Sequence, residues 1–600
     1  MLDSIYLIGK NNSDKIIEEL IKPLNLGKSK KEDILLIIIF NLDNGKVEFC
    51  PKELDGQVAK EYKWIGNTFS AAREPIARLT IDNIKYLYED EKNNIIYNIR
   101  NKIKNIKENS GIYLQELDDI LSDVEHIKLD KVKAEIEEYK NSKKDKYNIG
   151  LFTIGVKKNG KVIHLALENF YAEFIKWYIK YPDKPTEGSC HICGKSPDVF
   201  VDPAFESGSL LKIYNIDKKG FISGISNDYS QKGKTFALCP DCRLYLIIGN
   251  KYINNKLTFQ IDGSINVYVI PKISFTEYKQ EYIDRISDVI SGITFYEGFE
   301  NLNKIGLNIE ELFAEWYSFT IIFGSKEQAS FNLEYFIQEV PITNISIIYQ
   351  SINEIKEEAC KFWNNESKQW DLTLTGIARL YPLRKIGSEV EKGPLIELLA
   401  SIFQLDQYSL NKLLETAVLL AKVHRYELYN LYKIQQNEKD RALAHNIVKF
   451  NYLILLLKRL GMITMTKVSE NVSVDDERIS KWIETMGYNT LQTGLFMLGY
   501  LISQIGNAQY QRDDTKKSIL DKLDFKGMKK ERILMLVNEL PHHLRNYRIL
   551  GYNEKYYYTT MESLNKSIDK LDNNPIENLF YILSGYAFGT YSAISGVKNE

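Results

Sequence analysis

The 600-residue sequence lacks the features of membrane and secreted proteins. It contains no uninterrupted apolar run of about eighteen residues, so no transmembrane helix is expected. Six cysteines are too few for a disulfide-rich scaffold. The opening stretch MLDSIYLIGKNNSDKII carries Asp3 and no small-residue cleavage site, so it is not expected to be a signal peptide. These absences predict a cytoplasmic protein without a membrane partner.

Motifs of common enzyme classes are also missing. The sequence has no GxxxxGK[ST] phosphate loop, no GxSxG elbow, no HExxH motif and no GxGxxG after a strand. It also lacks the adjacent His and Asp of phosphohydrolases. Over a chain of this length, these absences favour a binding or scaffold role, and we expect the protein not to be an enzyme.

The remaining charged pairs have ordinary structural interpretations. His542-His543 is interpreted as part of a basic helix-terminal patch, although catalysis there stays open as the less favoured alternative. Asp118-Asp119 and Asp475-Asp476 are interpreted as charges at helix starts rather than metal ligands.

Charge of either sign is not in excess. The chain has 78 Lys and Arg against 80 Asp and Glu, a formal net charge of -2. This balance neither favours nor excludes nucleic acid, because phosphates are bound by local patches.

Hydrophobic patterning predicts an α+β fold. Four hairpins with alternating apolar residues are predicted in the first half, with antiparallel sheet. They occupy residues 34–49, 147–167, 256–270 and 318–337. The first two have strong turn signals at Asp43-Asn44-Gly45 and Asn159-Gly160. From about residue 343 the spacing becomes helical, which predicts a C-terminal all-α bundle.

The chain is too long for one compact core, so two to four domains are the starting expectation. The patterning divides it into an N-terminal α+β domain, a cysteine-containing insertion, a continuation of the α+β domain, a helical region and a C-terminal helical bundle. The predicted bounds are 1–183, 184–250, 251–342, 343–465 and 466–600.

Two CxxC pairs are the strongest chemical signal. They comprise Cys190, Cys193, Cys239 and Cys242. Two sulfurs from one tight turn can reach the same tetrahedral ion, so the two arms predict a structural four-cysteine zinc site. Gly194 follows the first pair where a turn often needs a positive φ, and Pro240 stiffens the second.

Alternatives to the zinc site are a vacant site and, less favoured, a redox centre, which would need one CxxC after a strand in a βαβ unit. His191 is interpreted as a spacer. Cys50 and Cys360 are expected to be isolated and buried.

The stretch between the cysteine arms is predicted to contact nucleic acid. Basic residues alternate with aromatic ones there, which suits phosphate contact and base stacking. A solvated loop is an equally weighted alternative. The lysines are Lys212, Lys218, Lys219, Lys232 and Lys234.

Three further stretches hold candidate nucleic-acid contacts. Loop and helix-face roles without nucleic acid are at least as well supported for each. The candidates are Asn67, Arg73 and Arg78 in GNTFSAAREPIARLT, Lys529 and Lys530 in FKGMKKERI, and Arg545 and Arg548 in HHLRNYR.

Methionines are confined to the C-terminal part. Apart from Met1, every methionine lies at or after Met462. The favoured interpretation is that methionine fills irregular helix cores. A second interpretation follows from a family resemblance.

The order of segments resembles a known family. An α+β half precedes the CxxC pairs with NIDKKGF between them, then EYFIQEVPITNI, FMLGYLISQIGNAQ and FYILSGYAFGTY follow. Over essentially its full length the chain resembles the large subunit of type I-B CRISPR interference complexes (Cascade), of the Csh type.

The resemblance implies a role without cleavage. Such subunits recognise the protospacer-adjacent motif on duplex DNA, stabilise the R-loop in antiviral defence and dock a separate nuclease-helicase. The implied partners are the CRISPR guide RNA, double-stranded target DNA, the displaced single strand, and the backbone and small Cascade subunits. Sequence specificity then comes from base pairing, which leaves a short motif and shape to the protein.

The resemblance also gives the methionines a second meaning. In related complexes the small subunit can arise by internal initiation, and Met462 and Met465 are candidate internal starts.

Two other classes of function remain open. One is a zinc-containing nuclease or nucleotidyl transferase whose active site is not visible in the sequence. The other is a scaffold that binds only protein.

Overall fold

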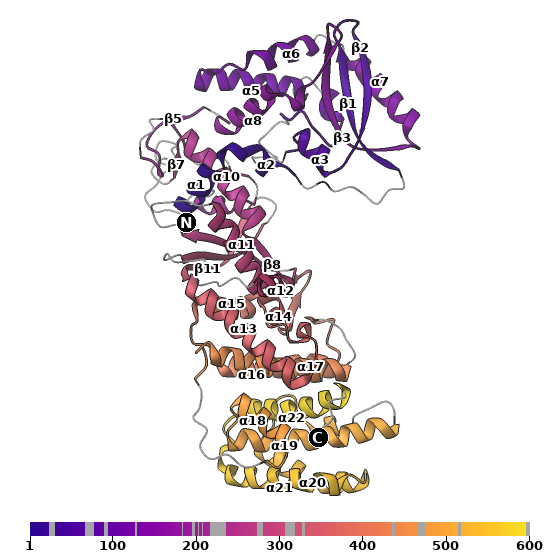
Figure 1. The fold of residues 1–600 in the computed structure, drawn as a ribbon, viewed down its shortest axis with the longest axis vertical. Coiled ribbons are helices and arrows are strands. Elements are labelled where there is room, and N and C mark those ends of the chain that lie inside the picture. The colour runs from indigo at the N-terminus through magenta and orange to yellow at the C-terminus, as the bar shows by residue number, and fades with distance from the viewer. Residues whose placement is uncertain are drawn as a thin grey trace. The chain divides into compact units, whose positions relative to one another are not determined.

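Figure 1 shows the computed structural model of the chain. It describes residues 1–22, 24, 31–65, 77–88, 94–125, 129–182, 184–194, 198–201, 203, 205–206, 208–215, 236–263, 265–272, 280–305, 318–326, 330–434, 439–464, 474–513 and 518–595. These residues form two compact units. The first comprises 1–258, 268–280 and 324–334, and the second 259–267, 281–323 and 335–600. The predicted α+β class is confirmed.

The first unit contains a four-stranded sheet in the order β2-β1-β3-β4. Its strands are β1 (Glu32–Asn41), β2 (Lys46–Glu53), β3 (Tyr147–Lys158) and β4 (Lys161–His164). The β1–β2 and β3–β4 pairs are antiparallel, which confirms the first two predicted hairpins. The two hairpins join through a parallel pairing of β1 with β3, which the sequence did not indicate. A parallel pair needs a long crossover, and helices fill this one.

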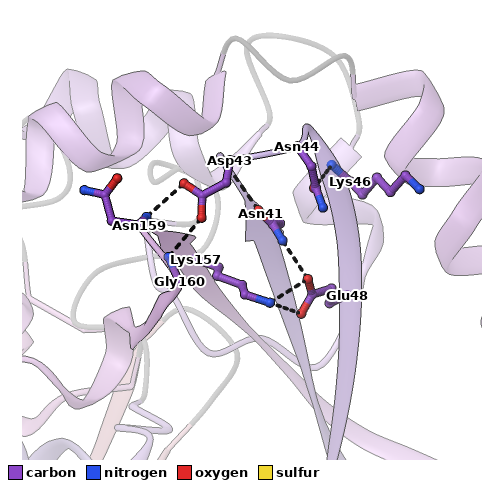
Figure 2. A network of polar contacts seen from close by, with 8 residues as sticks. All are labelled: Asn41, Asp43, Asn44, Lys46, Glu48, Lys157, Asn159 and Gly160. Atoms are coloured by element: carbon purple, nitrogen blue, oxygen red, sulfur yellow. Dashed lines mark hydrogen bonds and ion pairs between the residues drawn. The ribbon is translucent and has the colours of Figure 1, made fainter.

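The tips of the two hairpins are tied together (Figure 2). The Asp43 carboxylate accepts hydrogen bonds from the backbone N–H groups of Asn159 and Gly160, at 2.8 and 3.0 Å. The Gly160 and Asn159 bonds lower the pKa of Asp43. Glu48 accepts from Lys157 Nζ at 3.0 Å, linking the outer strand β2 to β3. These contacts therefore fix the register between the β1–β2 hairpin and the β3–β4 hairpin, which are far apart in sequence.

Helices complete the first unit. Asp118 lies in the first turn of α6, accepts from Arg100 Nε at 2.9 Å and is thus a helix-start charge as predicted. The helices of the first unit, with η for 3-10 helices, are α1 (Leu2–Asn11), η1 (Ser13–Lys15), α2 (Ile16–Leu20), α3 (Gly56–Glu61), α4 (Lys85–Tyr88), α5 (Ile95–Ser110), α6 (Gln115–Glu125), α7 (Leu129–Lys143), η2 (Leu165–Leu167), α8 (Asn169–Lys180), η3 (Leu210–Tyr214) and α10 (Pro240–Lys256).

A second four-stranded sheet has the order β11-β10-β9-β8. Its strands are β8 (Thr258–Ile261), β9 (Ile265–Lys272), β10 (Ser318–Lys326) and β11 (Phe331–Pro341). The neighbouring pairs β8–β9 and β10–β11 confirm the third and fourth predicted hairpins. Helices α11 (Gln280–Thr294) and α12 (Tyr296–Ile305) lie between β9 and β10 in the chain.

The second unit becomes largely helical after β11, as predicted (Figure 1). Its bounds are α13 (Ile342–Trp363), η5 (Ser367–Trp370), α14 (Leu374–Ala378), α15 (Gly393–Gln404), α16 (Leu410–Arg425), α17 (Lys439–Arg459), α18 (Glu477–Met486), α19 (Thr490–Asp513), η6 (Ser518–Lys522), α20 (Lys530–Asn546), α21 (Leu550–Lys566), η7 (Ile568–Lys570) and α22 (Pro575–Ser595). The sequence missed a small sheet of order β13-β12-β14, with β12 (Leu383–Ile386), β13 (Glu389–Val390) and β14 (Tyr432–Lys433). Strands of two to four residues are too short to show a period of two.

Helix α22 forms the centre of the C-terminal bundle, and its residues from Asn578 to Tyr591 are buried. It crosses α19 closely. A Cβ on Gly499 would lie 1.8 Å from the Ile582 carbonyl oxygen, and a Cβ on Gly585 would lie 1.8 Å from the Phe496 carbonyl oxygen. Aromatic side chains close the core nearby: the Trp363 ring lies 5.4 Å from Phe588 and 5.8 Å from Trp482.

The C-terminal motifs fit this bundle. Asp476 is the N-cap of α18, where its side chain accepts from Ile479 N at 2.9 Å, so it is a helix-start charge. Met462, Met497 and Met528 are buried, as core-filling methionines should be, whereas Met535 is 56% exposed. Met465 lies outside the described residues. None of the helices within the described residues has the length and apolar character needed to cross a membrane.

Candidate metal centre

The two cysteine arms are held by a small sheet and one helix of the first unit. The sheet has the order β5-β6-β7, with β5 (Thr186–Glu187), β6 (Asp198–Val201) and β7 (Ala237–Leu238). The first arm forms a tight turn, in which Gly194 N donates to Cys190 O at 2.8 Å. Gly194 has φ +70°, as its position after the CxxC pair predicted.

The second arm joins β7 to α10. Cys239 is the N-cap of that helix, and its Sγ accepts from Cys242 N at 3.4 Å. Pro240 occupies the first helical position, where its missing N–H costs no hydrogen bond. The second pair of sulfurs therefore sits at a helix N-terminus, where negative charge is stabilised.

The four sulfur atoms converge. Those of Cys190, Cys193, Cys239 and Cys242 all lie within 4.8 Å of one another, and Cys193 Sγ is 3.9 Å from Cys239 Sγ. A tetrahedral zinc ion with bonds of about 2.3 Å places its sulfurs about 3.8 Å apart. Cys193 is exposed and the other three are buried. The donor set and its spacing fit a metal ion such as zinc.

The electrostatics of the cluster favour a cation. Hydrogen bonds from Cys242, through its thiol and its backbone N–H, outweigh burial and lower the pKa of Cys239 to about 5. The same interaction, together with burial, raises the pKa of Cys242. Burial also raises the pKa of Cys190. Crowded sulfurs thus resist full ionisation by themselves, and a bound cation would relieve that repulsion.

His191 is a spacer, as predicted. Its backbone N donates to Ala237 O at 2.9 Å, and its Nδ1 accepts from Ala237 N at 3.0 Å. These contacts bind the first arm to β7, and the Nδ1 atom of His191 is used by the hydrogen bond to Ala237.

Side chains of helix α10 stabilise the cysteine centre through contacts that the sequence did not reveal. Arg243 has no exposed surface, and its guanidinium donates to the Ile179 carbonyl and lies 5.6 Å from the Phe200 ring. Asp241, between the two cysteines of the second arm, pairs with Lys180 at 2.6 Å. An arginine between the second CxxC pair and the apolar run LYLII is the signal that could have identified this support.

Helix α1 packs against α10 at a crossing of two glycines. A Cβ on Gly9 would lie 1.7 Å from the Tyr245 carbonyl oxygen, and one on Gly249 1.9 Å from that of Ile5. The signal was an isolated glycine inside each helical pattern, which usually has a packing reason. The first residues of the chain thus form part of the support for the cysteine centre.

Most predicted contacts of the N-terminal half lie outside the described residues. These are Asn67, Arg73, Lys218, Lys219, Lys232 and Lys234. Arg78 is described and 9% exposed, and its Nη1 donates to Ile65 O at 2.8 Å. Lys212 lies in η3, half-buried. Nucleic-acid contact by any of these residues stays a prediction.

The C-terminal candidates lie at opposite ends of α20. Lys529 is its N-cap residue and Lys530 pairs with Asp572 at 3.5 Å. Arg545 lies in the last turn and Arg548 just beyond, both exposed. At 1.5 Å per residue the two pairs are about 25 Å apart along the helix, so they are separate patches. His543 also belongs to the last turn, which confirms a helix-terminal basic patch.

The prediction that Cys50 and Cys360 are both buried is wrong. Cys50 is exposed rather than buried, because it lies on β2, an edge strand of the first sheet. Cys360 has intermediate exposure. Neither belongs to the four-sulfur cluster.

Two family profiles match the chain. The central domain of CRISPR-associated protein TM1802 matches residues 187–340, a range that begins in β5 and contains all four clustered cysteines. The C-terminal domain of the same family matches residues 372–600. No curated protein matches the sequence. The two profiles together cover the cysteine centre and the helical bundle, and the chain belongs to the CRISPR-associated protein TM1802 family.

Proposed function

We propose that this protein is the non-catalytic large subunit of a type I-B CRISPR RNA-guided surveillance complex. The observation that carries the proposal is the family match over the cysteine centre and the helical bundle. It agrees with the resemblance in segment order and with a role in CRISPR defence. In this proposal the subunit recognises the protospacer-adjacent motif, stabilises the R-loop and docks the nuclease-helicase.

The proposed metal is a structural zinc ion held by Cys190, Cys193, Cys239 and Cys242. Four thiolates fill the tetrahedral coordination of zinc and leave no position for water or substrate. Such an ion would pin the two ends of the stretch between the arms to α10 and β7. Its role is therefore structural, in accord with a subunit that does not cleave.

Nucleic-acid contact is proposed to be dominated by phosphate. The basic patches at the two ends of α20 suit a single strand, because each lysine or arginine that reaches a phosphate releases counterions. The separation of these patches suits an extended strand better than one compact site.

The test separates binding from cleavage. The purified chain, alone and with guide-loaded partner subunits, is titrated with labelled target duplex at rising salt, and cleavage is assayed with Mg²⁺ and Mn²⁺. The proposal predicts binding that weakens steeply with salt and DNA that stays intact. Arg545→Gln with Arg548→Gln should weaken binding and lower the salt slope by about 2, since two phosphate contacts are lost. The matched control Lys361→Gln, an exposed lysine on α13, should change neither.

Metal-dependent cleavage by the isolated chain would support instead a zinc-containing nuclease or nucleotidyl transferase. Absence of binding to DNA and to guide-loaded partners would contradict both and leave a protein-only scaffold.

A further inference from the structure

A polar cavity of about 300 Å³ lies in the second unit, and none of the four clustered cysteines lines it. It is lined by residues 295–297 at the junction of α11 and α12, by η5, by α14 and the residues after it, and by α17. Its volume is at the small end of ligand pockets, which suits a ligand the size of a single nucleotide rather than a larger cofactor.

The lining carries an excess of positive charge. Lys368, Arg379 and Lys449 line the cavity together with Asp371 and Glu297. Asp371 is engaged by its own segment, because its Oδ1 accepts from Thr373 N at 3.0 Å and from Thr373 Oγ1 at 2.6 Å. Its Oδ2 lies 4.0 Å from Arg379 Nη1, a long contact. The carboxylates therefore neutralise the three cations only in part.

Lys449 is the most unusual of these groups. It is 8% exposed, and across the described parts of the chain its ammonium makes no ion pair. Burial lowers the pKa of the Lys449 ammonium, while Asp371 acts in the opposite direction. A buried cation without a paired anion is costly, so an anion in the cavity would stabilise it.

Other lining residues also hold unsatisfied polar atoms. Among the residues that the structure describes, Thr375 Oγ1 and His445 Nε2 are buried and have no hydrogen-bond partner. Thr375 as a whole is 6% exposed. Buried polar groups are nearly always paired, so two orphans beside one polar cavity indicate a place built for a ligand.

Two aromatic residues also line the cavity. Phe295 and Tyr296 are half-buried, and Lys368 Nζ lies 6.0 Å from the centre of the Tyr296 ring. Aromatic faces suit a planar ring, and neighbouring cations suit a phosphate.

We propose that this cavity binds a nucleoside monophosphate, with its base against Phe295 and Tyr296 and its phosphate near Lys449, Arg379 and Lys368. The inference stands apart from the proposed function, because it concerns a pocket for one nucleotide rather than a surface for a strand. A free nucleotide and the 5′-terminal nucleotide of a strand share this chemistry.

Isothermal titration of the full chain with adenosine monophosphate, adenosine and inorganic phosphate tests the proposal. We expect saturable binding of the monophosphate at one site, with adenosine and phosphate each at least tenfold weaker. Arg379→Gln and Lys368→Gln should each weaken binding at least tenfold, whereas the control Lys361→Gln should leave it unchanged. Lys449→Met should abolish it, with the circular dichroism spectrum retained.

If Lys449→Met does not fold, Arg379→Gln alone still tests the proposal, because Arg379 is largely exposed. Absence of saturable binding, equal binding of adenosine, or equal affinities of Arg379→Gln and Lys361→Gln would overturn the proposal. Competition by a 5′-phosphorylated trinucleotide identifies a strand end as the source, and lack of competition identifies the free nucleotide; both follow only after saturable binding is seen.

Discussion

At the scale of single residues, four cysteines decide the chemistry of the first unit. Their sulfurs meet although the two pairs are separated by more than forty positions in the sequence. The convergence depends on two local devices, the positive φ of Gly194 and the capping of α10 by Cys239. Gly194 directly follows the first CxxC sequence, and Cys239 is the first residue of the second.

Replacing one cysteine should release the metal. Cys190→Ser or Cys239→Ser is expected to lose the bound zinc and to unfold the cysteine insertion locally, because metal binding energy is folding energy in such sites. The helical bundle should stay intact. Metal analysis and hydrogen exchange of residues 184–194 and 236–258 against 490–513 check this.

The matched control is Cys50→Ser, since Cys50 is exposed and lies outside the cluster. It should keep the metal and the exchange pattern. A Cys239→Ser protein with full metal content and native protection would contradict the proposed metal centre.

A buried histidine should make the second unit sensitive to acid. His424 has no exposed surface, and its ring contacts Tyr429 Oη at 3.2 Å and Asn446 Nδ2 at 2.9 Å. Burial lowers the pKa of His424 from 6.5 to about 4. Below its unfolded pKa, the unfolded chain binds a proton that the folded chain does not. The contribution of His424 to the free energy of unfolding is therefore fully present above about pH 6.5. It falls as the pH drops towards 4, by about 3 kcal/mol at most.

Urea unfolding at pH 7 and pH 4.5 measures this loss. His424→Gln should reduce the pH dependence of the second unit's unfolding free energy, whereas His542→Gln, at an exposed histidine, should keep it. Equal pH dependence in both variants would show that His424 is not the group responsible.

At the scale of elements, each unit contains a close helix crossing built on glycine. In the first, Gly9 of α1 meets Gly249 of α10, and in the second, Gly499 of α19 meets α22 near Gly585. Backbones approach so closely there that a methyl group would overlap a carbonyl oxygen. These crossings bring together segments that are far apart in sequence.

An alanine at such a crossing should destabilise its unit. Gly585→Ala is expected to lower the free energy of unfolding by about 1–3 kcal/mol through overpacking. Gly551→Ala is the control, because a Cβ on Gly551 of α21 meets nothing within 4 Å, and it should raise stability by up to about 1 kcal/mol through helix propensity. Equal thermal denaturation midpoints for the two variants would rule out the close crossing.

The elements show where sequence reasoning succeeded and where it stopped. Turn residues such as Asp43 and Asn159 predicted the hairpins, because turn chemistry is local. The parallel pairing of β1 with β3 was not predictable, since partner choice depends on packing between distant segments. The cysteine cluster was predictable from spacing, whereas the exposure of Cys50 depended on which strand became an edge. Lys449 gave no signal, because a lysine in an apolar helix is usually placed at the surface.

At the scale of the whole molecule, the family match links the cysteine centre and the helical bundle to CRISPR defence. An internal start at Met462 or Met465 would produce the segment from α18 to α22 alone. That segment would leave Trp482 and Phe588 without their contacts to Trp363. Such a product would need a partner surface, as a small subunit within an assembly has.

The most direct test of the central claim is to purify the tagged chain from its host, sequence the bound RNA and identify bound proteins by mass spectrometry. We expect short RNAs with a common repeat-derived 5′ end, together with backbone subunits. A C-terminal fragment whose first residue is Met462 or Met465 would support internal initiation. Recovery of the intact chain by itself, without RNA or backbone subunits, would contradict the proposal that it is the large subunit of a guided complex.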